Sequence, residues 1–275
     1  MKKVLFASTA LVLTAGVAAA DVTISGSANM GLYYSDAAGD TVVKNEIDFD
    51  VKGSGETDGG IAFGASVDLD ADSNNSAHTT GGGASDPEVF ISYEGLTLTV
   101  GDIGEAQDTG GIADVGFDGL GVDDIVDDYG ENGSDDVRID YSFGDYSVAV
   151  SLDSSNDDIA LAFSGSIDGF SFSAGFRDNT VGDNDMKATI GYSAGAFSVN
   201  ATYVDNGVLN DTAYGIDASY TSGDVTVTAA YAERDSGADA YGIGVAYDLG
   251  GATLAGGFGE VNGDQRADLG ISFKF

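Results

Sequence analysis

Acidic residues are the most chemically suggestive groups in this sequence, and they gather in one long segment. Between Ile103 and Asp135 no stretch predicts a convincing strand, and carboxylates alternate there with small apolar residues. Long connections in compact proteins are usually functional or disordered. A merely solvated loop would not need Ile112, Val115 or Leu120, so we expect residues 103–135 to fold inward and pack against a wall.

Two chemical uses are open to these carboxylates. Clustered acids repel one another, and a bound calcium ion relieves that repulsion by taking oxygen ligands. The candidate calcium ligands are Asp123, Asp124, Asp127, Asp128 and Glu131. The alternative is a solvated acidic rim without metal, and no organic cofactor is required in either case. The spacing Asp68-x-Asp70-x-Asp72 opens like an EF-hand, but Ser73 replaces the turn glycine, so that match is poor.

Catalytic groups are scarce, which argues against an enzyme. A serine nucleophile needs an activating base, normally histidine, and His78 is the only histidine of the chain. His78 lies in a Gly/Ser/Thr-rich stretch, as a loop residue would. One histidine and no cysteine cannot supply a zinc ligand set. We therefore predict a protein that is not an enzyme.

The charge balance restricts the partners. The formal net charge is −36, and it becomes −38 when Lys2 and Lys3 are left out. Such a chain repels nucleic acid and anionic lipid, so we expect no nucleic-acid partner. The acid is compatible instead with a path for cations, with bound calcium, or simply with solubility.

Residues 1–20 have the pattern of a cleavable secretory signal peptide. Lys2 and Lys3 precede an apolar run from Val4 to Val17, and the small residues Ala18–Ala20 follow. The run is too short for a spanning helix. We expect cleavage after Ala20, which leaves residues 21–275 as one domain.

Strict alternation of apolar and polar residues is the dominant structural signal of residues 21–275. In the last segment Leu269, Ile271, Phe273 and Phe275 fall on one parity, with polar or small residues between them. A period of two predicts strands with one face in an apolar medium. Sixteen such segments are predicted, at 22–34, 42–53, 60–70, 87–94, 95–102, 136–143, 145–153, 157–167, 169–177, 185–193, 196–205, 212–221, 224–233, 240–249, 251–260 and 265–275.

These segments predict an all-β, 16-stranded antiparallel transmembrane β-barrel in contact with outer-membrane lipid. The breaks after even-numbered strands are tight turns, such as Gly144-Asp145, and those after odd-numbered strands are longer, such as Ala71 to Asp86. Outer-membrane barrels show this asymmetry, with the short turns in the periplasm. A soluble β-sandwich is the weaker alternative, because no second buried face is evident.

The basic residues support the same conclusion. A charge that faces lipid near the membrane midplane costs roughly 2–4 kcal/mol. All eight basic residues after position 20 fall on the polar parity of their strands, which predicts that they face the lumen: Lys44, Lys52, Arg138, Arg177, Lys187, Arg234, Arg266 and Lys274.

The whole chain after residue 20 resembles the trimeric general porins of alphaproteobacteria. The segments that carry the resemblance are DVTISGSANMGLYYS at 21–35, LTVGDIGEAQDTGG at 98–111, ADAYGIGVAYDLG at 238–250 and ADLGISFKF at 267–275. The resemblance implies a homotrimer in the outer membrane of a Gram-negative bacterium. It also implies that residues 103–135, after the fifth strand, form the constriction of a water-filled channel.

The family constriction sets acids on this loop against basic residues on the facing wall. By resemblance the loop acids are Glu105, Asp108, Asp114, Asp118, Asp123 and Asp124, and the wall cations are Lys44, Lys52, Arg138 and Arg177. The chain departs from the basic half of the pattern, since its cations are scattered singly over many strands. We therefore expect passive diffusion of small hydrophilic solutes and ions with a preference for cations. The alternatives are a substrate-specific channel of the same fold, or a structural or adhesive surface barrel with a plugged lumen.

Overall fold

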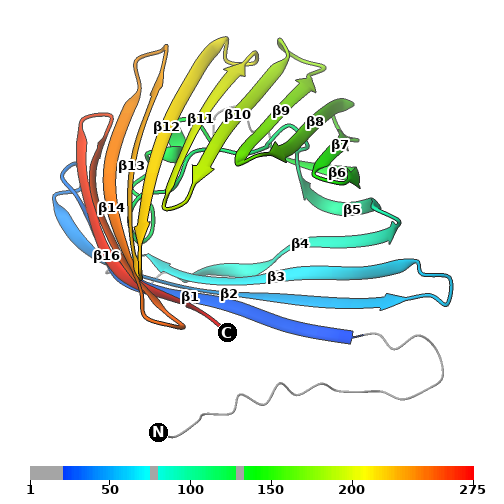
Figure 1. Cartoon of the computed structure of the whole chain (residues 1–275), viewed down its shortest axis with the longest axis horizontal. Coiled ribbons are helices and arrows are strands. Elements are labelled where there is room, and N and C mark those ends of the chain that lie inside the picture. The colour runs from blue at the N-terminus through cyan, green and yellow to red at the C-terminus, as the bar shows by residue number, and fades with distance from the viewer. Residues whose placement is uncertain (1–20, 75–79, 128–132) are drawn as a thin grey trace, which may run out of the picture.

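The computed structural model describes residues 21–74, 80–127 and 133–275. The predicted signal peptide and His78 lie outside these ranges. The described residues form a closed barrel of sixteen antiparallel strands, each paired with its neighbours in sequence (Figure 1). The predicted fold class is therefore confirmed.

The strands are β1 (Asp21–Ser35), β2 (Asp40–Glu56), β3 (Ala62–Asn74), β4 (Thr80–Tyr93), β5 (Leu96–Gly104), β6 (Ser134–Phe143), β7 (Tyr146–Asp153), β8 (Asp158–Ile167), β9 (Phe170–Asp178), β10 (Asp185–Ala194), β11 (Phe197–Asn206), β12 (Asp211–Ser222), β13 (Val225–Arg234), β14 (Asp239–Asp248), β15 (Thr253–Val261) and β16 (Asp264–Lys274). A single turn of 3-10 helix, η1 (Asp123–Ile125), lies in the connection between β5 and β6. No helix among the described residues is long and apolar enough to cross a membrane.

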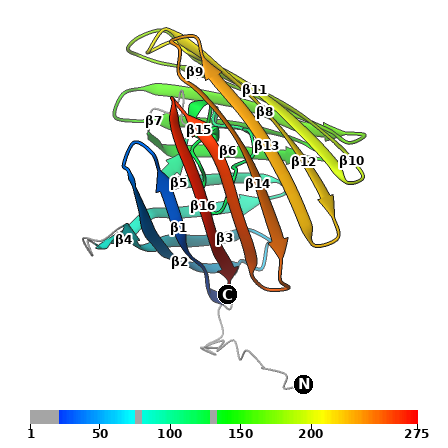
Figure 2. The same cartoon turned by 90° about the vertical axis from the view of Figure 1, so that its left-hand side faces the viewer.

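Alternation along each strand sends apolar side chains outward. On β14 the large residues Tyr241, Ile243 and Val245 are exposed on the outside, while Ala240 is fully buried. A barrel can carry so many apolar side chains on its outer surface only where lipid covers that surface. The strands run obliquely across the barrel (Figure 2), as closure of a sheet requires.

The two ends of the barrel sheet close on each other. β1 pairs with β16 in the register Met30↔Ile271, and Gly26 and Phe275 exchange two backbone hydrogen bonds of 2.9 Å. The terminal Phe275 ring also contacts Phe49 edge-on at 5.5 Å between centroids. Closure leaves the sheet without an exposed edge.

The prediction of a loop from Ala71 to Asp86 was wrong. β3 continues to Asn74 and β4 begins at Thr80. The sequence of this stretch is polar on both parities, so alternation could not reveal the strands. The same hairpin places Asp68 and Asp70 in an extended strand, which excludes an EF-hand loop there.

The contrast between short and long connections holds only in part. β15 and β16 are joined by the two-residue turn Asn262-Gly263, in which both residues have positive φ. Such a turn matches the twist of a tight hairpin. One connection remains out of scale, residues 105–133 between β5 and β6. Its described part, residues 105–127, is called the inner loop below.

Candidate functional site

The inner loop folds into the barrel and packs on its inner wall (Figure 1). The buried apolar cluster combines the loop residues Ile112, Val115, Leu120, Val122, Ile125 and Val126 with wall residues Val204, Ala213, Ala230, Ala232, Ala240 and Val261. The wall residues belong to β11–β15. The prediction that the loop's small apolar residues pack against a wall is confirmed.

Glycines on the inner face of the wall let the loop lie directly on the sheet. A Cβ atom at Gly257 would lie 2.8 Å from the Cα of Gly116, and one at Gly175 would lie 2.2 Å from the carbonyl oxygen of Gln107. Both distances are below any real Cβ contact with backbone. The absence of a side chain at these glycines therefore lets the loop backbone contact the sheet directly.

A carboxylate on β16 holds the far end of the loop. Asp268 accepts hydrogen bonds from the backbone N–H groups of Phe117 (2.7 Å), Asp118 (3.0 Å) and Gly257 (2.7 Å). Asp268 is buried. Hydrogen bonds to an ionised acceptor are among the stronger ones in proteins, so this residue anchors the loop at residues 117–118.

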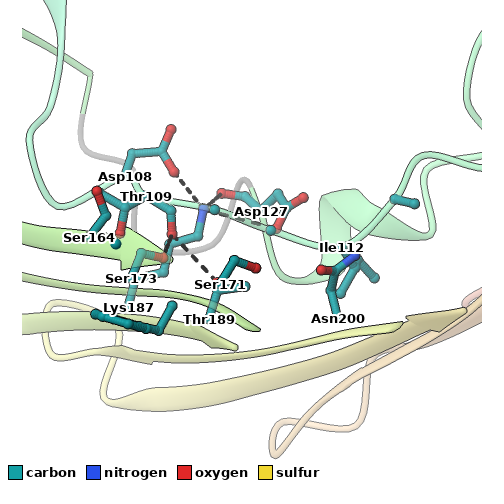
Figure 3. A pocket seen from close by; sticks show the side chains of 15 residues that line it. Asp108, Thr109, Ile112, Asp127, Ser164, Ser171, Ser173, Lys187, Thr189 and Asn200 are labelled. Atoms are coloured by element: carbon teal, nitrogen blue, oxygen red, sulfur yellow. Dashed lines mark hydrogen bonds and ion pairs between the residues drawn. The ribbon is translucent and has the colours of Figure 1, made fainter. Parts of the chain in front are cut away.

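Five wall cations bind the inner loop. Arg234 donates to the carbonyl oxygens of Asp124 (2.9 Å) and Ile125 (2.8 Å), and Arg266 donates to that of Leu120 (2.8 Å). The other three pairs are Lys44 with Asp118, Arg177 with Glu105, and Lys187 with Asp108 and Asp127 (Figure 3). These positive charges are therefore used to hold the loop.

Two of the predicted constriction residues are buried rather than lining open water. Arg177 and Glu105 pair at 3.1 Å, with side chains only 1% and 2% exposed. Glu105 follows β5 directly and meets β9 at the wall, so neither charge can contact a solute. Their expected place on the channel surface is corrected to a place behind it.

The other predicted loop acids remain accessible. Asp108, Asp114 and Asp124 are exposed, and Asp118 and Asp123 are half-buried. Of the predicted wall cations, Lys44 is paired with Asp118, Lys52 is exposed with its ammonium group over the Phe90 ring, and Arg138 is paired with Asp140 at 3.0 Å. The accessible loop surface is therefore acidic.

A second acidic surface, which the sequence did not single out, lies on the inner face of β2 and β3. It consists of Glu46, Asp48, Asp50, Asp68 and Asp70, and is called the acidic wall below. Asp48 stands directly opposite Asp70, and Asp50 opposite Asp68. Like charges directly opposite on a sheet destabilise it. Alternation marked these acids as inward-facing, but only the strand register brings them together.

Three carboxylates of the acidic wall accept hydrogen bonds from neutral groups of β1. The Ser27 hydroxyl donates to Asp48 (3.0 Å), the Ser25 hydroxyl to Asp50 (3.3 Å), and the Asn29 amide to Glu46 (2.9 Å). These bonds orient the carboxylates without neutralising them. The acidic wall therefore keeps its negative charge toward the lumen.

Asp123 on η1 is the most perturbed carboxyl of the inner loop. Burial, helped by the nearby Asp114 carboxylate, raises its pKa to about 7. The loop charge therefore changes near neutral pH.

Calcium finds no ready site in the described part of the loop. No group of three or more Asp, Glu, His or Cys among the described residues is arranged to hold a metal ion. Asp123, Asp124 and Asp127 belong to that part, whereas Asp128 and Glu131 lie outside the described residues. Calcium bound with their help stays a prediction.

A polar pocket of about 740 Å³ lies between the inner loop and β8–β11 (Figure 3). Ser171, Lys187, Thr189 and Asn200 line its wall side, and Asp108 lines its loop side. The Ser173 hydroxyl donates to the carbonyl oxygen of Thr109 at 3.0 Å and so fixes the loop above the pocket. The pocket is open to the lumen and adds hydroxyl groups to its surface.

A closed sixteen-stranded barrel with an apolar exterior, a charged interior and an inward loop defines an outer-membrane channel. The chain belongs to the Gram-negative porin family, whose model matches residues 7–271. It is 27% identical over 296 residues to a porin of Fuscovulum blasticum, covering 93% of this chain and 100% of that protein. The protein is thus a channel of the Gram-negative outer membrane for passive diffusion, and not an enzyme.

Solved structures show the same fold. An engineered mutant of the Rh. blastica porin superposes with a TM-score of 0.78 at 23% identity, covering 92% of this chain and 100% of that one. A second mutant of the same porin gives a TM-score of 0.79 at 23% identity with equal coverage. The resemblance stated from the sequence is confirmed.

Proposed function

We propose that this porin prefers cations, because acids lie on both the inner loop and the acidic wall. The acidic wall is the observation that supports the proposal most directly. A family-type constriction would place cations opposite the loop, whereas β2 and β3 place Asp48, Asp50 and Asp70 on the inner face. Five of the wall cations are occupied with the loop.

The size of the preference follows from Coulomb's law. A unit charge 10 Å away contributes about 0.4 kcal/mol in water, so four or five acids around the passage favour a cation by about 1–2 kcal/mol before screening. That energy corresponds to roughly a five- to thirtyfold bias over an uncharged solute of equal size, and an anion is disfavoured by a similar factor. Because the Debye length is about 10 Å at 0.1 M salt, the bias should weaken as salt is raised.

The proposed channel surface at the narrowest level consists of Asp108, Asp114, Asp118, Asp123 and Asp124 on the loop, with Lys44, Lys52 and Arg138 on the wall. Size selection comes from the gap between the loop and the wall. Small hydrophilic solutes and ions are the proposed permeants, driven by their own gradients.

Neutralising the acidic wall tests the proposal. The variant D48N/D50N/D68N/D70N keeps side-chain size and should reduce the cation-to-anion permeability ratio about threefold or more at 0.1 M KCl, measured as zero-current potential in planar bilayers. A matched control, D145N/D168N/D224N/D248N, removes four acids in or beside the turns that follow β6, β8, β12 and β14. An unchanged ratio in the wall variant would contradict the proposal.

The pocket between the loop and β8–β11 favours a substrate-specific channel as a second candidate. Its serine, threonine and asparagine groups match the hydroxyls of an uncharged solute. Saturable solute flux, or current block by a sugar at millimolar concentration, would support this candidate. A flux that rises linearly with solute concentration would support general diffusion.

Processing and assembly complete the proposal. We expect cleavage after Ala20, so that the mature chain begins with Asp21, the first residue of β1. We also expect a homotrimer, as the resemblance implies. N-terminal sequencing of protein purified from the outer membrane tests the first, and the mass of the unheated complex tests the second.

A further inference from the structure

We propose that Arg177 and Lys187 are positioning residues that tie the outgoing and returning limbs of the inner loop to the wall and thereby set the width of the passage. Neither residue contacts the solute in this proposal. The inference rests on the proposed role of the loop as the constriction, and it adds the groups that hold the constriction in place.

Arg177 joins the two ends of the connection between β5 and β6. One terminal nitrogen, Nη1, lies 3.1 Å from Glu105 Oε1 and 3.0 Å from Asp135 Oδ1. Glu105 is the first residue after β5, and Asp135 is the second residue of β6. A single guanidinium therefore ties the first residue of the inner loop to β6, the strand that pairs with β5 at this point through Ile103↔Asp135.

The rest of the guanidinium fixes its own direction. Nε donates to Asn179 Oδ1 at 3.2 Å, and Nη2 lies 3.5 Å from Asp158 Oδ2 at the start of β8. Asn179 in turn donates to Asp185 Oδ2 at 2.8 Å. Arginine's planar fork suits this role, because it can satisfy several carboxylates from one fixed position.

Lys187 makes the same kind of connection one strand further on (Figure 3). Its Nζ pairs with Asp108 on the outgoing limb, lies 3.9 Å from Asp127 Oδ1 on the returning limb, and donates to the Asp127 carbonyl oxygen at 3.5 Å. The lysine side chain is 6% exposed. Lys187 therefore holds the two limbs of the loop together from the barrel wall.

The two cations act at adjoining positions. In the register of β9 and β10, Arg177 stands opposite Asp185, and Lys187 opposite Gly175. Gly175 leaves room for the loop backbone at Gln107 to touch the sheet between the two cations. The loop can move toward the lumen only if this contact and both ionic connections break.

Burial makes the Arg177 connection insensitive to salt, because Arg177 and Glu105 are both buried, whereas the Asp108 side chain that pairs with Lys187 is 40% exposed. Exposed ion pairs are screened, whereas a buried pair is screened much less, and removal of one buried partner leaves an uncompensated charge. Lys44 and Arg266, whose side chains are 26% exposed, hold more distant parts of the loop through screened interactions. Arg177 should therefore hold the base of the loop in place over a wide range of ionic strength.

Single-channel recording tests the proposal with three variants. K187Q removes one connection, and R177M/E105Q/D135N removes the Arg177 connection together with the two carboxylates it would leave unpaired. In both we expect open-channel current noise to rise and mean conductance to grow, by about 1.5-fold or more, as the loop leaves its position. R177K keeps the charge and should restore part of the quiet wild-type current.

K274Q is the matched control, because it removes one inner-face cation at the turn end of the barrel, opposite Ser27 in β1. Retention of the compact, heat-sensitive band on gels shows that each variant has formed its barrel. If folded K187Q and R177M/E105Q/D135N channels have the conductance and noise of K274Q, the proposal is overturned. The proposed cation preference is measured separately, from the zero-current potential. Its absence would contradict the proposed function and leave the positioning role of Arg177 and Lys187 to be decided by conductance and noise.

Discussion

Single carboxylates play two different parts in this protein, and their surroundings decide which. Asp268 is buried and accepts three backbone hydrogen bonds, so its charge holds the loop. Asp50 and Asp70 are exposed and accept hydrogen bonds from serine hydroxyls, so their charge acts on the lumen. The same residue type thus anchors the loop in one place and, in the proposed function, attracts cations in the other.

Asp123 gives the channel a pH dependence near neutrality. Because burial raises its pKa to about 7, the carboxyl is neutral below that pH and gains its negative charge above it. Cation preference should therefore increase between pH 6 and pH 8, by about 1.5-fold for one added charge near 10 Å. Zero-current potentials recorded across this range measure the change.

D123N is the variant that isolates this effect, since its amide carries no charge at any pH. Its selectivity should stay flat between pH 6 and pH 8. D124N, which neutralises the neighbouring exposed acid, should keep the rise. A D123N channel with the full wild-type rise would show that another group titrates.

The sequence predicted the side on which each charge lies but not its partner. Alternation placed Arg177 and Lys187 in the lumen correctly, because a period of two fixes the face of every residue in a strand. It could not bring Glu105 to Arg177 or Asp48 to Asp70, since those contacts depend on the register and on the path of the loop. The buried ion pair and the acidic wall therefore emerged only from the structure.

At the scale of elements, the glycine-rich inner face of β14–β16 and the apolar face of the inner loop are complementary. Gly244 and Gly257 approach the loop backbone at Gly116, and Val115 and Leu120 fill the space around Gly242. The close fit of the two surfaces thus adds to the charged contacts, such as those of Asp268, that hold the far half of the loop.

G257A tests the importance of this fit. The added Cβ would lie 2.8 Å from the Cα of Gly116, so the loop must shift. We expect altered single-channel conductance in a barrel that still folds, at a cost of about 1–3 kcal/mol for the overpacked contact. G53A, where a Cβ meets nothing within 4 Å, is the control and should conduct like the wild type.

The strands themselves were largely predictable from the sequence. Lipid on the outside and water on the inside impose alternation on every membrane-spanning segment, and fourteen of the predicted strands required only changes of a few residues at their ends. Alternation failed in the β3–β4 hairpin because its outer part has polar residues on both faces. The inward course of the loop followed from its apolar residues, but the strands that receive it did not.

At the scale of the whole molecule, acidic and basic residues have different roles in the channel. The net charge of −36 is carried by a chain with ten basic residues, and five of those basic residues hold the loop. The passage is therefore left with acids on the loop and on the acidic wall. This arrangement predicts that negative charge dominates on both sides of the passage, instead of the acids on one side and basic residues on the other that the family resemblance implied.

The zero-current potential across a KCl gradient tests this account most directly. Purified wild-type protein is inserted into a planar bilayer of neutral lipid at pH 7.5, with 0.1 M KCl on one side and a higher concentration on the other. A cation-preferring channel gives a potential of cationic sign that shrinks as both concentrations are raised. A potential of anionic sign, or none at 0.1 M, would contradict the cation preference.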